Sequence, residues 1–259
     1  MGEYAAYLDA AESAAREAGE LLRKNLSQIG EIYFKGLVNL VTNSDTESQD
    51  LIFDRLSARF PGHDFLAEEG LKSLKGAEFR WVFDPLDGTT NFAHGFPVFC
   101  VSLGLEHRGR LACGVVYDPM REEIFWAEKG EGAYLNGERI RVSKINDLDR
   151  SLLATGFAYD IRETKTNIRQ ADDFLLRAQG LRRCGSAALD LCYVACGRFE
   201  GFWEMKLSPW DTAAGAVIVE EAGGRVSDFQ GNPVDIYHPE VVASNGLVHQ
   251  AMMDVLNLP

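Results

Sequence analysis

The chain has 259 residues and 46% hydrophobic content, enough for one large domain or two packed lobes with a sizeable core. Its formal charge of −13, which no basic stripe offsets, argues against a nucleic-acid-binding surface. No apolar run approaches the length that spans a bilayer, and the charged, Ala-rich residues 1–25 lack the pattern of a signal peptide. The odd number of cysteines indicates reduced thiols, so we expect a cytoplasmic protein. From the charge and the lack of a long apolar run, we expect no nucleic-acid or membrane partner.

Helical spacing marks the N-terminal part of the chain. Apolar residues recur in steps of three and four from Tyr4 to Leu22, which predicts one buried helix face. A short strand is predicted over residues 31–35 and a loop over residues 36–43. Residues 44–47 then have the form of a capping box, and the second helix that they begin ends at Pro61-Gly62.

The remaining elements change rhythm near residue 147. From Phe99 to Val142, strands separated by turns predict an antiparallel meander; after about Asp147, strands alternate with helices, which favours a mixed sheet. We therefore predict two lobes, about 1–147 and 148–259, packed into one unit. The predicted strands are 63–67, 79–83, 101–106, 111–117, 123–127, 132–135, 152–155, 181–184, 199–203, 225–227 and 241–244. The predicted later helices are 167–178, 186–196, 211–221 and one from 247.

Residues 84–92 read Asp-Pro-Leu-Asp-Gly-Thr-Thr-Asn-Phe and follow an apolar run. Pro85 cannot continue a ladder, so the strand is predicted to end where the acids begin. Gly88 allows a sharp turn, and Thr89 can open a helix whose free N–H groups face an anion. Two carboxylates aimed at one spot repel each other unless a cation joins them. In isolation the pattern is also typical of a surface turn capped by Asp84.

Four acids share one context, the end of a strand or the start of a helix. Glu68 ends one predicted strand, Asp84 and Asp87 follow another, and Asp211 opens a helix after Ser208-Pro209-Trp210. Taken alone, Glu68 is typical of a solvated loop acid and Asp211 of a helix N-cap. Together, with no imidazole or thiolate nearby, they favour Mg²⁺ or Mn²⁺ over Zn²⁺. Two such ions about 4 Å apart activate water and clamp the oxygens of a phosphoryl displacement.

Several segments match one family in order. The nonapeptide resembles the first signature of the inositol monophosphatase family of Mg²⁺-dependent, lithium-sensitive phosphatases. Trp210-Asp211, with residues 213–215 and 221–224, resembles the second. Residues 41–45, 67–69 and 185–188, together with Glu204, also fall in family order, so the likeness covers nearly the whole chain.

The resemblance implies a complete site and a fold. The implied metal ligands are Glu68, Asp84, Asp87, Asp211 and the carbonyl oxygen of Leu86, and the implied phosphate-binding groups are the N–H groups of Gly88 and Thr89. Thr89 and Asp45 would orient the attacking water, and Glu68 with its metal would lower the pKa of that water. Gly185, Ala187 and Glu204, with Asp87 and Asp211, would contact the substrate, and Lys35 would lie on a mobile loop that helps to bind a further metal. The implied fold is a layered αβαβα sandwich, and a homodimer is expected.

The leading functional hypothesis is hydrolysis of inositol monophosphates. One alternative is another small phosphate, such as fructose 1,6-bisphosphate, histidinol phosphate or NADP; a phosphatase of 3′-phosphoadenosine compounds is less favoured, because such relatives tend to be longer. Another is a contact-acting regulatory protein. Residues 155–160 and the segment to Asp173 are expected to set selectivity, and no motif there names a sugar or polyol.

Overall fold

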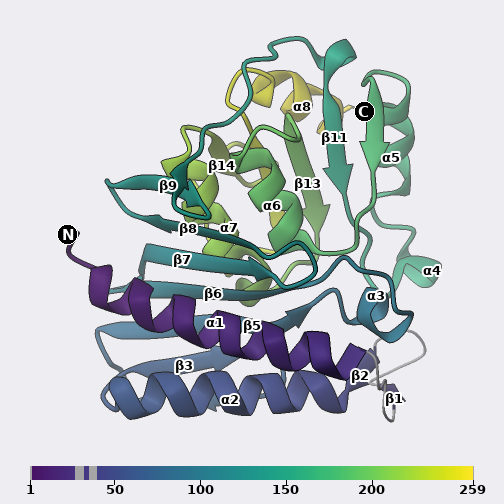
Figure 1. Cartoon of the computed structure of the whole chain (residues 1–259). Helices are drawn as coiled ribbons and strands as arrows, with labels where there is room; N and C mark the ends of the chain where they lie inside the picture. The colour runs from purple at the N-terminus through teal and green to yellow at the C-terminus, as the bar shows by residue number, and fades with distance from the viewer. Residues whose placement is uncertain (1, 27–31, 35–39, 259) are drawn as a thin grey trace.

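The computed structural model describes residues 2–26, 32–34 and 40–258 (Figure 1). The helices are α1 (Ala5–Leu26), α2 (Asn43–Arg59), α3 (Thr89–Ala93), α4 (Ile161–Thr164), α5 (Ile168–Leu175), α6 (Ala187–Ala195), α7 (Pro209–Glu221) and α8 (His249–Leu256), with a 3₁₀ turn at Leu148–Arg150. The strands are β1 (Ile32–Phe34), β2 (Leu40–Thr42), β3 (Asp64–Ala67), β4 (Lys72–Ser73), β5 (Phe79–Asp87), β6 (Cys100–His107), β7 (Arg110–Asp118), β8 (Glu123–Glu128), β9 (Gly132–Leu135), β10 (Glu138–Arg139), β11 (Leu152–Thr155), β12 (Gly180–Arg182), β13 (Gly201–Met205), β14 (Arg225–Ser227) and β15 (Glu240–Ser244).

The larger sheet has eight strands in the order β10-β9-β8-β7-β6-β5-β3-β4. The predicted antiparallel meander is confirmed from β6 to β9, where each strand pairs with its neighbour in sequence, and β5 extends it by pairing antiparallel with β6. β3 joins this meander as a parallel neighbour of β5, a pairing that the strand pattern did not predict. Because β3 and β5 run in the same direction, the segments that follow them leave the sheet at the same edge.

The smaller sheet has five strands in the order β12-β11-β13-β15-β14. β11 is parallel to both β12 and β13, whereas β15 is antiparallel to β13 and β14, so this sheet is mixed as predicted. Every strand of the larger sheet comes from residues 64–139 and every strand of the smaller sheet from residues 152–244.

The layers alternate as helix, sheet, helix, sheet and helix, which confirms the predicted sandwich (Figure 1). α1 and α2 cover the outer face of the larger sheet, because an Ala- and Leu-rich face of α1 is buried from Leu8 to Leu22. α6 and α7 fill the space between the sheets, and α5 and α8 cover the far face of the smaller sheet.

α7 approaches the larger sheet closely because glycines face it. A Cβ atom added at Gly114 of β7 would lie 2.7 Å from the Cα atom of Ala214, and one added at Gly104 of β6 would lie 2.6 Å from the Cβ atom of Ala213. Contacts this short cannot exist in a packed core, so only glycine permits this docking distance. α7 is thereby held against β6 and β7, and it also packs on β5, the strand that carries the nonapeptide.

β5 is longer than predicted and includes the first two acids of the nonapeptide. Its pairing with β6 is regular to Asp84, is interrupted, and resumes at Asp87 opposite Cys100. Pro85 lies within the interruption, where its missing N–H costs no ladder bond. The expectation that the strand ends at the acids was therefore wrong in extent, although the regular ladder does lapse there.

Smaller differences concern short or irregular elements. Leu40–Thr42 forms a strand that pairs with Ile32–Phe34, where a loop was expected. α2 begins at Asn43, one residue before the predicted capping box. The predicted helix over 167–178 is confirmed in shorter form as α5, and the short helix α4 that precedes it was not predicted.

No helix in the described ranges has the length and hydropathy needed to cross a membrane. All five cysteines are free thiols. Cys192 is fully buried in the core between the sheets, and Cys196 packs against that core.

Candidate functional site

A cavity of about 540 Å³ lies where the ends of several strands and helices meet. Ten of the predicted site residues line it, from five separate segments of the chain. They are Glu68, Asp84, Leu86, Asp87, Gly88, Thr89, Gly185, Ala187, Glu204 and Asp211. Asp45 lies behind this lining, and Lys35 is outside the described residues.

The parallel pairing of β3 with β5 brings the first two acids together. Ala67 is paired with Phe83, so Glu68 and Asp84 are the next residues on adjacent strands. The Asp84 side chain is only 2% exposed, and its Oδ1 atom accepts a hydrogen bond from the Leu86 N–H group at 2.9 Å. The bond ties the carboxylate to the irregular turn that follows.

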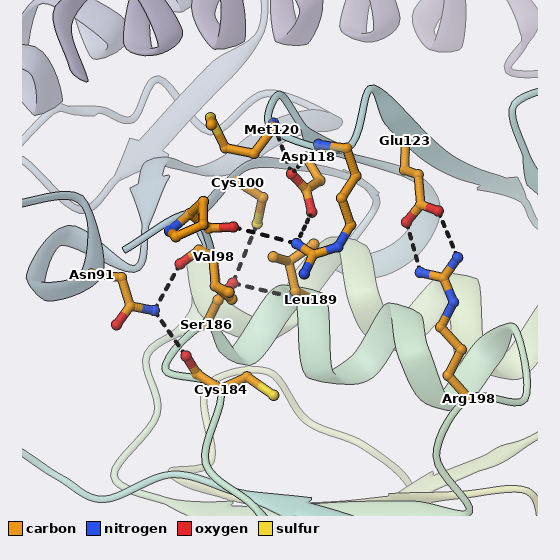
Figure 2. A network of polar contacts seen from close by, with 12 residues as sticks. Asn91, Val98, Cys100, Asp118, Met120, Glu123, Cys184, Ser186, Leu189 and Arg198 are labelled. Carbon is orange, nitrogen blue, oxygen red and sulfur yellow. Dashed lines mark hydrogen bonds and ion pairs between the residues drawn. The ribbon is translucent and has the colours of Figure 1, made fainter. Parts of the chain in front are cut away.

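Asp87 is joined to the N-terminus of α6, ninety-nine residues away in the chain. Its Oδ2 atom accepts hydrogen bonds from the Ser186 hydroxyl at 2.7 Å and from the Ala188 N–H group at 2.8 Å. Cys100, on the strand opposite, places its sulfur 3.5 Å from the same hydroxyl (Figure 2). One carboxylate oxygen is thus committed to α6, which fixes the direction of the other.

A second long-range contact supports this junction. The Asn91 side-chain amide donates to the carbonyl oxygen of Val98 at 2.7 Å and to that of Cys184 at 2.8 Å (Figure 2). Asn91 belongs to the nonapeptide, so a single side chain connects the nonapeptide to the loop that enters α6. The interaction fixes the loop containing Gly185.

Thr89 and Asp45 form a buried pair. The Thr89 hydroxyl lies 3.0 Å from Asp45 Oδ1 and 3.1 Å from the carbonyl oxygen of Leu86. A hydroxyl carries one hydrogen, so it donates to one of these acceptors at a time. Donation to the Asp45 carboxylate leaves the lone pairs of the Thr89 oxygen able to accept a hydrogen bond from a water in the cavity.

Gly88 forms the turn between β5 and α3. Its φ angle is 102°, in the left-handed region that side chains disfavour. A Cβ atom here would also lie 2.9 Å from the carbonyl oxygen of Val98. Both constraints require glycine, and the turn presents the first N–H groups of α3, which have no intrahelical partner, beside the acids.

Asp211 reaches the same place from α7. Asp84 pairs with Ser102 in the sheet, and the Ser102 hydroxyl lies 3.4 Å from the carbonyl oxygen of Trp210. The helix begins at Pro209 with Ser208 as its N-cap, so Asp211 is its third residue and not its first, as the sequence suggested. Its Oδ2 atom accepts the Ser208 N–H at 2.7 Å, a reciprocal capping contact.

The acids destabilise one another's charged forms. Burial raises the pKa of Asp84 well above its ordinary value, and the carboxylates of Glu68, Asp87 and Asp211 raise it further. The pKa of Asp211 is raised by burial and then by Glu68 and Asp87. Burial also raises the pKa of Asp87, against the hydrogen bonds from Ser186 and Ala188. A divalent cation would relieve this repulsion.

The donor set fits a hard cation bound partly through water. In the ranges that the structure describes, no three His, Cys, Asp or Glu side chains are grouped as a ready-made metal cage. Mg²⁺ keeps several waters and binds through one or two carboxylates plus substrate phosphate oxygens, so such a cage is not what it requires. The lining offers carboxylates and the Leu86 carbonyl oxygen, which are oxygen ligands of that kind.

The smaller sheet contributes a second group of residues to the cavity wall. Glu204 follows Trp203, which pairs with Thr155, so its carboxylate packs on Gly156; a Cβ atom there would lie 2.2 Å from it. Burial raises the pKa of Glu204 to about 8, with contributions from Asp190 and Asp87.

Residues 156–160 line the cavity, as expected of the selectivity segment. The Asn167 side-chain amide donates to the Thr155 hydroxyl and to the Gly156 carbonyl oxygen, both at 2.7 Å, and so fixes the start of this segment. At its other end, Asp160 forms an ion pair with Lys206. Burial and the acids, first Glu68, raise the pKa of Tyr159, whose ring also lines the cavity.

Sequence reasoning missed Ser186, Asn91, Asp190 and Arg183 as lining or supporting residues. Asn91 and Ser186 stood within the quoted motifs, but their partners lie about a hundred residues away, so no local pattern connects them.

Comparison with known proteins identifies the family of this chain. The model of the inositol monophosphatase family matches residues 3–257. Inositol monophosphatase 1 of Solanum lycopersicum is 43% identical over 99% of this chain and 97% of its own. Nus factor SuhB of Escherichia coli K12 is 44% identical over 95% and 94%. The structure of an inositol monophosphatase from Anabaena superposes with a TM-score of 0.91 at 41% identity, over 100% of this chain and 98% of that one. With a family match over nearly its whole length, this chain belongs to the inositol monophosphatase family.

Proposed function

We propose that this protein is a Mg²⁺-dependent phosphomonoesterase that hydrolyses inositol monophosphates to inositol and phosphate. The observation that carries the proposal is the meeting of four mutually repelling acids with the Gly88 turn and the Thr89–Asp45 pair in one cavity. Acids alone would fit many cation sites. These acids lie beside the Gly88 turn, whose N–H groups can bind a phosphate, and beside the Thr89 hydroxyl, and this combination fits hydrolysis of a phosphate ester. The names of the similar proteins support the substrate.

Each residue has a role in this proposal. Glu68, Asp84, Asp87, Asp211 and the Leu86 carbonyl oxygen would hold Mg²⁺ or Mn²⁺, which neutralises phosphate charge and lowers the pKa of bound water when it is present. The N–H groups of Gly88 and Thr89 bind the phosphate at the first turn of α3. Asp45 accepts the Thr89 hydrogen, so that the Thr89 oxygen accepts one from the attacking water and aims it at phosphorus. Glu204, Gly185 and Ala187 contact the alcohol.

The test is phosphate release from inositol 1-phosphate with Mg²⁺, with and without excess chelator. The same assay with fructose 1,6-bisphosphate, histidinol phosphate and NADP ranks the substrates. The expected result is chelator-sensitive turnover with the highest kcat/KM for the inositol ester. Robust turnover in chelator would contradict the metal mechanism, and a higher kcat/KM for another phosphate would replace the substrate.

A second candidate function is regulation by contact, and the name Nus factor SuhB of a 44% identical relative favours considering it. The variant Asp87→Asn separates the two functions, because it removes a cavity carboxylate and leaves the surface intact. A cellular phenotype that the inactive variant rescues would support a contact role. The resemblance also carries the expectation of a homodimer, which sedimentation would test.

A further inference from the structure

The interruption in β5 places two acids of the cavity on one face of the sheet. Side chains of a regular strand alternate between faces, so Asp84 and Asp87, three residues apart, would point to opposite sides. Asp84 nevertheless pairs with Ser102, and Asp87 with Cys100, two residues of β6 that share a face. Between these pairs, two residues of β5 oppose one residue of β6, which is a β-bulge. The bulge is therefore what allows both acids to line the cavity.

The backbone groups of the bulge need partners other than β6. Pro85 and Leu86 have no paired residue there, and Pro85 has no N–H group. The Leu86 N–H group donates to Asp84 Oδ1 at 2.9 Å, and the Leu86 carbonyl oxygen lies 3.1 Å from the Thr89 hydroxyl. The Pro85 carbonyl oxygen accepts a hydrogen bond from the Ser48 hydroxyl at 2.8 Å. Of these three contacts, only that of Ser48 comes from outside the nonapeptide.

Ser48 belongs to the buried face of α2. Its side chain is 0% exposed and Pro85 is buried as well, so bulk water does not compete for their hydrogen bond. Asp45 lies three residues earlier on the same face, and its carboxylate lies 3.0 Å from the Thr89 hydroxyl. One face of α2 thus contacts both the bulge and the first residue of α3.

We propose that Ser48 is a positioning residue for the cation site: its hydroxyl fixes the conformation of the bulge and thereby the relative direction of the Asp84 and Asp87 carboxylates. This rests on the proposed phosphatase function, in which these two acids hold Mg²⁺ or Mn²⁺. Ser48 lies outside both signature motifs and does not itself line the cavity, so it acts only through the backbone of the bulge.

Loss of the Ser48 hydroxyl should affect cation binding more than folding. A buried carbonyl oxygen that loses its donor is costly, and the bulge can relieve that cost by turning its peptide group toward another partner. Such a rotation changes the direction of the carboxylates on either side of it. Mg²⁺ requires nearly ideal octahedral geometry, so its affinity depends on these directions. Groups that orient metal ligands without touching the metal typically contribute about 10- to 100-fold in affinity.

The experiment compares the wild type with Ser48→Ala. The matched control is Ser151→Ala, because Ser151 is also 0% exposed and its hydroxyl also donates to a backbone carbonyl oxygen at 2.8 Å, that of Asp147, away from the cavity. The first measurement is a titration of the chelator-treated protein with Mn²⁺, followed by the paramagnetic resonance signal of the free ion. The second is the Mg²⁺ concentration that gives half-maximal phosphate release from inositol 1-phosphate. Ser48→Cys, which keeps the size of the side chain but offers only a weak S–H donor, replaces Ser48→Ala if that variant does not fold.

Ser48→Ala is expected to raise the Kd for Mn²⁺ and the half-maximal Mg²⁺ concentration by about tenfold or more, and Ser48→Cys should raise both by less. Ser151→Ala should leave both unchanged, although both alanine variants lower Tm by a similar amount, about 2–4 °C. Unchanged Mn²⁺ affinity in a folded Ser48 variant, or an equal loss in Ser151→Ala, would overturn the positioning role while the phosphatase function stands. Mn²⁺ binding that depends on Ser48, in a protein that hydrolyses no phosphate ester, would keep the positioning role and remove the proposed function.

Discussion

Replacing Thr89 by Val tests the water-orienting pair directly. Val has nearly the same shape as Thr, so the change removes one oxygen that lies 3.0 Å from Asp45 Oδ1 and 3.1 Å from the Leu86 carbonyl oxygen, in a residue only 4% exposed. Loss of a group that positions the attacking water should lower kcat by about 10²- to 10⁴-fold, or about 3–5 kcal/mol in the barrier. KM should change little, because the N–H groups that hold the phosphate remain.

The effect on folding should be much smaller. One buried hydrogen bond contributes about 1 kcal/mol, which corresponds to a shift of about 2–4 °C in Tm for a chain of this size. The assay is steady-state phosphate release at saturating Mg²⁺, with Thr89→Ser as the matched control that restores the hydroxyl. The double variant with Asp45→Asn should be little worse than Thr89→Val alone, since the two act as a unit. Near-full activity in Thr89→Val, or equal losses in Val and Ser, would refute the assigned role.

Four further outcomes are expected. Asp87→Asn should lower kcat by about three orders of magnitude with an unchanged circular dichroism spectrum, because a cavity charge is lost while the amide still accepts from α6. Mg²⁺ should raise Tm by mass action and a chelator should abolish turnover, whereas lithium should inhibit; an unchanged Tm would argue against cation binding. Glu204 is protonated up to about pH 8 in the folded chain, whereas in the unfolded chain it ionises near its ordinary pKa of 4.5. The stability of the wild type, measured by urea titration, should therefore fall between about pH 5 and 8 relative to that of Glu204→Gln. Parallel stability curves for the two proteins would contradict the raised pKa. Gly114→Ala should lower the free energy of unfolding by about 1–3 kcal/mol through overpacking on Ala214, and unchanged stability would mean that α7 can move away at no cost.

The sequence predicted the long elements and the chemistry of the acids, since both are local. The face from Leu8 to Leu22 has a helical period and the run before Asp84 is continuously apolar, and neighbouring layers bury both. Strands of two or three residues, such as Lys72–Ser73, are too short to show a period and exist only because a neighbour pairs with them.

The candidate site divides in the same way. The nonapeptide alone predicts Asp84, Asp87 and the turn at Gly88, and the resemblance to the family implies that Asp211 lies beside these residues. Two hydrogen bonds, from Ser186 to Asp87 and from Asn91 to the Cys184 carbonyl oxygen, depend on the docking of segments that are distant in sequence. The parallel pairing that sets Glu68 next to Asp84 is also a tertiary fact, because no turn connects these strands.

The origin of the two cavity walls has a consequence for how such a protein can diversify. The acids at the ends of β3 and β5, the turn and Thr89 come from the larger sheet, whereas Gly156 follows β11 and Glu204 lies in β13 of the smaller one. In the proposed function, most groups of the reaction and the groups that contact the alcohol therefore come from different parts of the chain, which meet at Asp87 and the start of α6; Asp211, on α7, is the exception. We expect replacements within residues 156–160 to change which alcohol is accepted without changing the groups assigned to cleavage.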